Sequence, residues 1–314
     1  MNMTLAETAG KLLRAQNVVL TAHVNPDGDA IGSSLGLMHL LRGLGKEAAV
    51  LLDDDVPKAF SILPGYEAIK RPEGERSADL LVILDTAPDR IGGVAKCVQA
   101  DACINIDHHR TNAAEGDTYL APDRAATAEI VYELASEMKA AFTKDSALCI
   151  YTGLATDTGF FRYSNTTARV MRAAAHLMDC GAEPHIVSEA LEQKPYQMIC
   201  DTAEALQHIE RFADGRAAGI FLDHETTERM ESTEGFIDFV RVIEGVDVAV
   251  LLKAKEEKLC RVSMRSKGTD VSAIAASFDG GGHMRAAGCT LKMGFDEAKK
   301  RIMAAIADRL EGES

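Results

Sequence analysis

Histidine and aspartate residues with the spacing of metal ligands lie near the start of the chain. The stretch TAHVNPDGDAIGSS contains His23, Asp27 and Asp29 within seven positions, directly after a run of apolar residues. Imidazole and carboxylate ligands without a thiolate suit Mn²⁺, with Zn²⁺, Co²⁺ or Mg²⁺ as other options. The segment NPDGD is also common turn chemistry, so by itself it would predict only a loop.

Similar side chains end two further apolar runs. Asp85 ends LLVILD, and CINID leads into the tripeptide Asp107-His108-His109. We interpret both runs, together with NVVLTAHV before them, as buried parallel strands. The carboxyl ends of parallel strands meet at one edge of an α/β sheet, so these side chains are expected to converge there. A single Asp at a strand end is usually a cap or turn residue, but three such ends together favour a shared site.

Crowded aspartates need neighbouring cations. Asp27, Asp29, Asp85 and Asp157 would carry four negative charges, and like charges raise one another's pKa. Two divalent ions would neutralise this set. The sequence therefore predicts a centre with two divalent metal ions, for which Mn²⁺ is the favoured metal.

Strands and helices alternate in the first part of the chain, which predicts an open, mostly parallel α/β sheet flanked by helices. A fourth strand candidate, AVLLD, lies at 49–53. The helical periods lie at 30–45, 126–140, 145–156 and 166–180.

A second pattern begins near residue 215 and predicts a smaller α/β domain. Its strand candidates are RAAGIFLD, VDVAVLLKAK and KLCRVSMRS, and its helix candidates are VSAIAASF and FDEAKKRIMAAIADRL. We expect a metal-binding catalytic domain at 1–190, a helical linker at 191–214 and a substrate-binding domain at 215–314. The active cleft is expected between the two domains.

The candidate substrate-binding residues lie in this second domain. Arg261, Ser263 and Arg265 share one face of a predicted strand, because side chains alternate along a strand. The stretch 251–270 holds six basic and three acidic residues, against a net charge of −14 for the whole chain. A half-exposed edge strand with solvated arginines would show the same pattern.

The segment GGGH at 280–283 is expected to be a loop. Backbone N–H groups of Gly281 and Gly282 could approach an anion there without obstruction from side chains, and His283 follows them. Glycine runs are often simple turns, but the basic strand nearby favours a phosphate-binding site.

Composition excludes several classes of protein. With 34 basic and 48 acidic residues, the chain is not expected to bind long duplex nucleic acid, which requires Lys and Arg to neutralise phosphates. Its seven cysteines are scattered and form no CxxC pair, as expected of reduced thiols in a cytoplasmic protein. No signal peptide is apparent, and no apolar run approaches the ~20 residues that a membrane span needs.

Six segments together resemble a known family. HVNPDGDAIGSS, ILDT, NIDHH and TGLATDTGFFRYSNTT are similar to the four motifs of the DHH phosphoesterase superfamily. RVSMRSK and GGGHMRAAG are similar to the DHH-associated C-terminal domain, although Asp279 stands where many relatives have another glycine. The chain length fits the subfamily of oligoribonucleases (nanoRNases) and pAp phosphatases.

The resemblance implies a role for each motif residue. Two Mn²⁺ ions would share Asp85, and Asp107 would orient a neighbouring histidine. His109 would face the substrate phosphate. One ion would be held by His23, Asp27 and Asp85, and the other by Asp29, Asp85, His108 and Asp157. The nucleotide or its terminal phosphate would be bound by Arg261, Arg265, Gly281, Gly282 and His283.

The function implied is Mn²⁺-dependent hydrolysis of phosphate esters. The substrates would be oligoribonucleotides of two to five nucleotides, pAp-type nucleotides, or linear or cyclic dinucleotides. A family II inorganic pyrophosphatase shares the metal motifs and is an alternative, although the GGGHMRAAG segment speaks against it. A nucleotide sensor without catalysis is an alternative of another class. The sequence leaves the oligomeric state open, a homodimer included.

Overall fold

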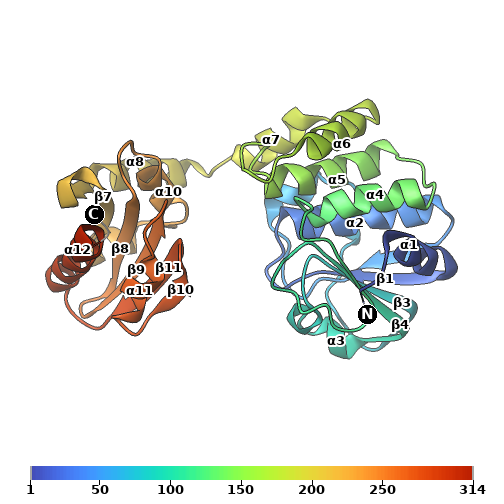
Figure 1. Cartoon of the computed structure of the whole chain (residues 1–314), viewed down its shortest axis with the longest axis horizontal. Helices are drawn as coiled ribbons and strands as arrows, with labels where there is room; N and C mark the ends of the chain where they lie inside the picture. The colour runs from blue at the N-terminus through green and yellow to red at the C-terminus, as the bar shows by residue number, and fades with distance from the viewer. Residues whose placement is uncertain (1, 313–314) are drawn as a thin grey trace. The chain divides into compact units, whose positions relative to one another are not determined.

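The computed structural model describes residues 2–312, which form two compact units (Figure 1). The first unit extends to Gln193, and the second begins at Lys194. The sequence had indicated a helical linker at 191–214, but most of that segment belongs to the second unit. Its residues 209–212 form a strand that pairs in the second unit's sheet, a role that its mixed polar and apolar pattern did not indicate.

The first unit is built on a five-stranded sheet in the order β2-β1-β3-β4-β5, in which every neighbouring pair is parallel. The α/β architecture expected from the sequence is therefore confirmed, with a short fifth strand added at one edge. The strands are β1 (Asn17–Thr21), β2 (Glu47–Val50), β3 (Arg76–Leu84), β4 (Val98–Asp107) and β5 (Thr118–Leu120).

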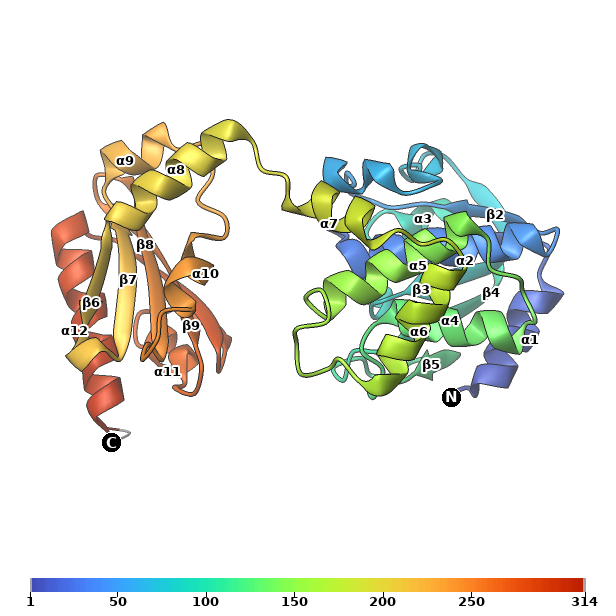
Figure 2. The same cartoon turned by 90° about the horizontal axis from the view of Figure 1, so that it is seen from above.

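Helices cover both faces of this sheet unequally. The main core lies between one face and α2, α4 and α5, and a smaller apolar cluster on the other face packs against α3. Figure 2 shows α5 among α2, α4 and α6. The α-helices are α1 (Leu5–Arg14), α2 (Gly28–Gly43), α3 (Val94–Cys97), α4 (Thr127–Glu137), α5 (Lys144–Asp157), α6 (Ala168–Asp179) and α7 (Pro184–Glu192). Single 3₁₀ turns are η1 (Lys58–Ile62), η2 (Tyr66–Ala68) and η3 (Pro88–Arg90).

A seam of glycines lets α2 approach α5 closely. Gly28, Gly32 and Gly36 repeat every four residues and therefore lie on one face of α2. A Cβ atom on Gly32 would lie 2.5 Å from the carbonyl oxygen of Cys149, and one on Gly28 would lie 2.4 Å from a methyl carbon of Thr156. This close contact brings the first turn of α2 beside the last turn of α5.

The second unit contains a mixed six-stranded sheet in the order β10-β11-β9-β8-β7-β6, in which only β7 and β8 are parallel. The strands are β6 (Ile209–Phe212), β7 (Ala217–Leu222), β8 (Val248–Glu256), β9 (Leu259–Ser266), β10 (Gly281–His283) and β11 (Ala286–Leu291). The helical elements are α8 (Tyr196–Gln207), η4 (Ala213–Gly215), α9 (His224–Arg229), α10 (Phe236–Arg241), α11 (Val271–Ala276) and α12 (Phe295–Gly312).

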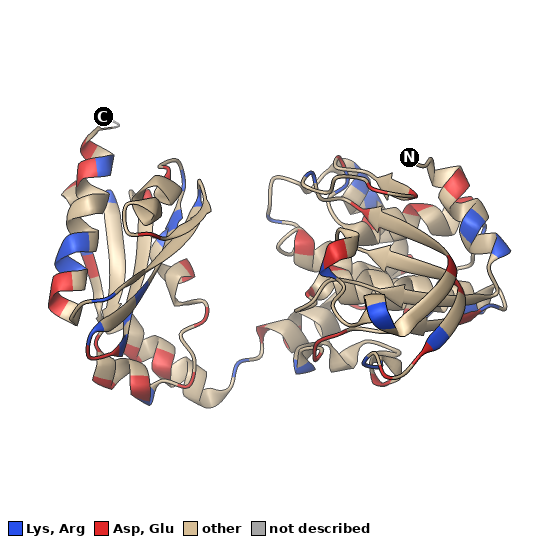
Figure 3. Cartoon of the chain, turned by 90° about the horizontal axis from the view of Figure 1, so that it is seen from below, with Lys and Arg blue, Asp and Glu red and all other residues tan. Residues whose placement is uncertain are grey.

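Two apolar clusters stabilise the second unit, one on each face of its sheet. One cluster joins the sheet to α11 and α12, and the other joins it to α8 and α10. Acidic and basic residues are mixed over the helices of both units (Figure 3). None of the described helices is long and apolar enough to span a bilayer.

The segment GGGH was expected to be a loop, and this expectation is wrong. Residues Gly281–His283 form β10, which pairs antiparallel with β11. Glycine has no side chain to produce an alternating pattern, so the sequence gives no sign of this strand. A Cβ atom on Gly282 would lie 2.5 Å from the carbonyl oxygen of Ala286, so the tight hairpin requires glycine there.

Candidate metal centre and active site

The carboxyl edge of the first unit's sheet gathers the histidines and aspartates singled out from the sequence. His23 lies two residues beyond β1, Asp85 directly follows β3, and Asp107 is the last residue of β4. Because these strands are parallel neighbours in the sheet, their ends lie side by side. The sheet thus brings together residues that are more than eighty positions apart in the chain.

One group of possible ligands consists of His23, Asp27 and Asp85. The Nε2 atom of His23 lies 3.7 Å from Oδ1 of Asp27 and 3.6 Å from Oδ2 of Asp85. Asp27 is the N-cap of α2, where one of its oxygens accepts from the backbone N–H groups of Asp29 and Ala30. The helix start therefore fixes the carboxylate of Asp27 beside the imidazole.

A second group consists of Asp29, His108 and Asp157. The Nε2 atom of His108 lies 3.3 Å from Oδ2 of Asp157, 3.5 Å from Oδ1 of Asp85 and 3.9 Å from Oδ2 of Asp29. Asp157 ends α5 and Asp29 lies in the first turn of α2, so the glycine seam between these helices positions both carboxylates. Asp85 stands between the two groups, within 3.6 Å of both histidines.

The hydrogen bonds of the two histidines direct one ring nitrogen of each into the cluster. Nδ1 of His23 lies 2.9 Å from the carbonyl oxygen of Val24, and Nδ1 of His108 lies 3.3 Å from that of Arg124. A carbonyl oxygen can only accept, so both Nδ1 atoms carry a proton, and in the neutral ring Nε2 is the nitrogen with a free lone pair. Nε2 of His108 is buried and has no hydrogen-bond partner among the described residues.

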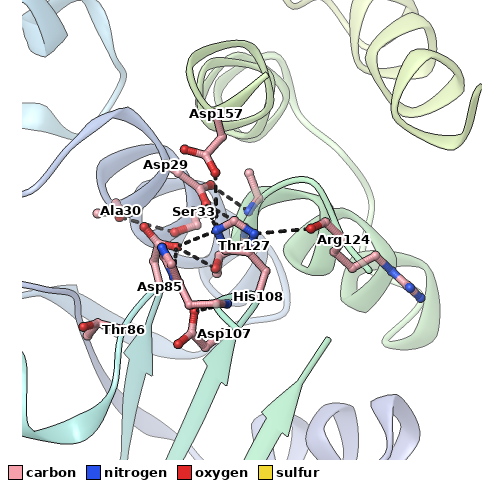
Figure 4. A network of polar contacts seen from close by, with 12 residues as sticks. Asp29, Ala30, Ser33, Asp85, Thr86, Asp107, His108, Arg124, Thr127 and Asp157 are labelled. Atoms are coloured by element: carbon pink, nitrogen blue, oxygen red, sulfur yellow. Dashed lines mark hydrogen bonds and ion pairs between the residues drawn. The ribbon is translucent and has the colours of Figure 1, made fainter. Parts of the chain in front are cut away.

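Thr127, which sequence reasoning missed, holds two of these aspartates (Figure 4). Its hydroxyl donates to Oδ1 of Asp85 over 2.9 Å, and its backbone N–H donates to Oδ2 of Asp29 over 2.6 Å. The N–H of Ala128 donates to the other oxygen of Asp29. The start of α4 therefore orients the carboxylates of both Asp29 and Asp85. A threonine at a helix start is too common to indicate this role from sequence.

Asp107 and His109 lie at the edge of the cluster. Nδ1 of His109 is 3.6 Å from Oδ1 of Asp85, and His109 forms a third group of possible ligands with Asp85 and His108. The backbone N–H of His109 and its Nδ1 donate to Oδ1 of Asp107 over 3.0 and 2.8 Å, and Asn112 donates to Oδ2 over 2.6 Å. Asn112 also contacts Asn105, whose amide donates to backbone carbonyls at the end of β3. His109 is half exposed, so its ring is held on one side and open to solvent on the other.

The crowded carboxylates favour the protonated form of the two neighbouring histidines. Hydrogen bonds to Asp27 and Asp85 raise the pKa of His23 to about 10. Burial opposes the charge on His108, but Asp85 and Asp157 raise its pKa to about 9. A metal ion bound here would compete with these protons, because its ligand is the neutral Nε2 atom.

The aspartates respond to the same crowding in different ways. Burial, together with the charges of Asp85 and Asp157, raises the pKa of Asp29 well above its usual value. Burial and the charge of Asp85 raise the pKa of Asp157 to about 7. Burial also opposes the charge on Asp85, but the nearby imidazoles of His108 and His23 outweigh it and hold the pKa of Asp85 below its usual range.

The donor set fits divalent metal ions. It offers carboxylate oxygens and imidazole nitrogens, with an orphaned buried Nε2 atom on His108. Asp85 has a φ of +62°, a left-handed conformation that residues other than glycine rarely adopt and that is concentrated at functional sites. The strained backbone aims its carboxylate at both histidines.

The candidate substrate residues lie on the second unit's sheet. Arg265 on β9 is paired in register with Ala286 on β11, which in turn pairs with His283 on β10. Arg265 and His283 therefore lie in one row across the sheet. Ser263, Gly288 and Gly281 form the next row, and Arg261 lies beyond it.

Comparisons with known proteins agree with this architecture. Residues 17–154 match the DHH family N-terminal domain, and residues 218–312 match the DHHA1 domain. A bifunctional oligoribonuclease and PAP phosphatase NrnA from Thermus thermophilus is 37% identical over 299 residues, which cover 93% of this chain and 90% of that protein. The cyclic-di-AMP phosphodiesterase PdeA of Listeria monocytogenes is 25% identical over 96% of this chain, but this match spans only 49% of that protein.

A solved structure is similar along nearly the whole chain. The exopolyphosphatase-related protein from Bacteroides fragilis superimposes with a TM-score of 0.82 at 27% identity, over 97% of this chain and 95% of that one. The motif residues, the strand-end cluster and the domain matches therefore agree, and the chain belongs to the DHH family, with a DHH domain followed by a DHHA1 domain.

Proposed function

We propose that this chain is a metal-dependent phosphoesterase that hydrolyses short oligoribonucleotides and pAp-type nucleotides. The observation that carries the proposal is the position of Asp85, within 3.6 Å of His23 in one ligand group and within 3.5 Å of His108 beside the other. A carboxylate between two ligand groups suits a pair of divalent ions. When bound, two such ions would activate a water molecule and neutralise the phosphoryl oxygens.

The ligands proposed for the ions are those named by motif. His23, Asp27 and Asp85 would hold one ion, and Asp29, Asp85, His108 and Asp157 the other. Imidazole and carboxylate donors without thiolate favour Mn²⁺ over softer metals. This assignment is supported by the two groups His23-Asp27-Asp85 and Asp29-His108-Asp157, in each of which the ligand atoms lie within 4.8 Å of one another.

His109 is proposed as the catalytic residue that contacts the substrate phosphate. Its hydrogen bond to Asp107 is the main cause of its raised pKa, and this contact stabilises the protonated ring. With Nδ1 bound to Asp107, the Nε2–H group can donate to a phosphoryl or leaving oxygen. Asp107 holds the ring in place and stabilises its charge, and Asn112 fixes Asp107.

The second unit is proposed to bind the nucleotide portion of the substrate. Arg265 and His283 lie in one row of its sheet, beside the open glycines Gly281 and Gly282. A guanidinium group suits a terminal phosphate. This role is supported by the match of 218–312 to the DHHA1 domain and by the relative named as an oligoribonuclease and PAP phosphatase.

A hydrolysis panel with Mn²⁺ tests the proposal. The substrates are pAp, the dinucleotide pApA, a five-nucleotide RNA, cyclic di-AMP and pyrophosphate. We expect turnover of pAp and of the short RNAs with released phosphate or mononucleotide as product. Turnover of pyrophosphate alone would identify a pyrophosphatase instead. Tight binding of nucleotides with no turnover of any substrate would identify a sensor.

Asp85→Asn provides the matched control for this panel, because the substitution keeps the size of the side chain and removes its charge. The variant should lose activity on every substrate that the wild-type protein hydrolyses. Activity that survives in this variant would belong to a contaminating enzyme or to another site.

A further inference from the structure

A cavity of about 860 Å³ lies in the second unit, and the lysines that line it have no role in the proposed function. Lys253 on β8, Arg261 on β9 and Thr290 on β11 are paired in register, so they form one row across the sheet at the cavity wall. Lys292, one residue beyond β11, lines the same cavity.

The charges in this row are unfavourable without an anion. Lys253 and Arg261 are directly opposite each other on neighbouring strands, where Cβ atoms are about 4.5–5.5 Å apart and like charges repel. No ion pair within residues 2–312 involves Lys253, Arg261 or Lys292. Asp279 is the single acidic residue among those that line the cavity.

Lys253 is the most enclosed of these cations. Its ammonium group is half-buried and donates to the hydroxyl of Thr233 over 2.6 Å, a neutral partner. Burial, followed by the charges of Lys255 and Arg261, lowers the pKa of Lys253. A bound anion would remove both the repulsion and the cost of partial burial.

This row is separate from the row that contains Arg265 and His283. Arg261 and Arg265 are four residues apart on one strand, which corresponds to about 13 Å at ~3.3 Å per residue. Ser263, Gly288 and Gly281 lie between the two rows and have small side chains or none. The separation is several times the roughly 3.4 Å rise per nucleotide of a stacked strand, so the two rows suit different phosphates of one oligonucleotide.

We propose that Lys253, Arg261 and Lys292 form a second anion subsite, which binds a further phosphate of a short oligoribonucleotide whose terminal phosphate is held by the row of Arg265 and His283. This inference rests on the proposed function. It adds that the second unit favours substrates long enough to contact both rows. The floor of small residues between the rows leaves room for the intervening nucleotides. A substrate several nucleotides longer than a mononucleotide would contact both rows at once.

The test compares substrates of different length in charge-removal variants. We expect Lys253→Ala and Lys292→Ala to lower the ratio of kcat/KM for a five-nucleotide RNA to kcat/KM for pApA by roughly tenfold each, as for loss of one charge-assisted contact. Lys300→Ala is the matched control, since this exposed lysine lies on α12 outside the cavity and forms no described ion pair. Its ratio should equal that of the wild-type protein. Unchanged ratios in both cavity variants would overturn the proposal.

Direct binding separates this inference from the proposed function. Anisotropy of a fluorescent five-nucleotide RNA, measured in EDTA, should show weaker binding to Lys253→Ala than to the wild-type protein even if no substrate is hydrolysed. Titration with inorganic phosphate tests for a free anion as the occupant. Lys253→Ala could weaken the binding of inorganic phosphate and leave the binding of RNA unchanged. That result would overturn the proposal that the subsite binds the substrate.

Discussion

At the scale of single residues, the centre depends on side chains that hold other side chains. Asp29 is fully buried, and each of its oxygens accepts from a backbone N–H at the start of α4. Asp85 accepts from the hydroxyl of Thr127. Partners of this kind fix the direction in which a ligand presents its lone pairs, and their loss typically lowers metal affinity by 10- to 100-fold, as an order of magnitude.

Thr127→Val should therefore weaken metal binding by roughly tenfold or more, because valine has the same shape but cannot donate to Asp85. Thr127→Ser keeps the hydroxyl and should bind metal nearly as well as the wild-type protein. Calorimetric titration of both variants with Mn²⁺ measures the difference. Equal affinities for the valine and serine variants would show that the hydroxyl does not position Asp85.

The adjacent histidines should respond differently to substitution. His108→Ala removes a nitrogen that faces Asp85 and Asp157, so this variant should lose bound metal. His109→Ala should keep its metal and lose kcat, because its Nδ1 is already bound to Asp107. Elemental analysis combined with kcat distinguishes the two effects. Equal metal loss in both variants would contradict the separate roles.

The strand-end aspartates and histidines could be predicted from the sequence because parallel strands must bring their ends to one edge. Thr127 and Asn112 could not be predicted in the same way. Each acts through a hydrogen bond to a side chain that lies elsewhere in the sequence, Thr127 to Asp85 and Asn112 to Asn105 and Asp107. No periodic pattern reports such contacts.

At the scale of elements, the contact between α2 and α5 aligns the two groups of ligands. Asp27 and Asp29 lie at the start of α2, and Asp157 lies at the end of α5. The approach is close because glycines face the neighbouring helix. A side chain at Gly153 would lie 2.8 Å from Oδ1 of Asp29, so the seam reaches the centre itself.

Gly32→Ala should lower the free energy of unfolding by about 1–3 kcal/mol, because the added methyl group would overlap backbone atoms of α5. Gly43→Ala is the matched control at the other end of α2, where an added methyl group meets nothing within 4 Å. That variant should be neutral or gain up to about 1 kcal/mol from helix propensity. Urea unfolding of both variants measures the free energy of unfolding. Equal changes in both variants would contradict the claim that the contact between α2 and α5 requires glycine at position 32.

Elements were predicted unevenly from the sequence, for physical reasons. The buried strands β1, β3 and β4 consist largely of apolar residues and were recognisable as strands. β10 consists of two glycines and a histidine, and β5 has only three residues, so neither carries a pattern long enough to detect. The alternation expected in β9 is confirmed, with Cys260, Val262 and Met264 buried.

At the scale of the whole molecule, the two units contribute different chemical groups. The first unit contains the aspartates and histidines of the candidate metal centre, and the second unit contains Arg265 and His283. Under the proposed function, hydrolysis of a nucleotide would need both units, whereas hydrolysis of a minimal phosphodiester would need mainly the first.

Arg265→Ala should reduce kcat/KM for pApA by roughly 10- to 100-fold, the effect of losing a guanidinium–phosphate contact. The same variant should hydrolyse bis-p-nitrophenyl phosphate within a few fold of the wild-type rate, because this compound offers no second phosphate. Steady-state kinetics on both compounds provide the comparison. Equal losses on both would mean that Arg265 supports the fold, and no loss on either would remove it from substrate binding.

The candidate ligands come from four separate segments, which follow β1, β3 and β4 or end α5. A bound ion would act as a reversible cross-link among them, closing chain loops that folding otherwise has to close unaided. At 100 times its dissociation constant, one such ion would add about 2.7 kcal/mol to the stability of the first unit. Its melting temperature should rise with Mn²⁺ concentration and fall in EDTA, while the second unit, which holds none of the ligand groups, should melt at a constant temperature. Calorimetric scans that show both transitions moving together, or neither moving, would contradict a cross-link confined to the first unit.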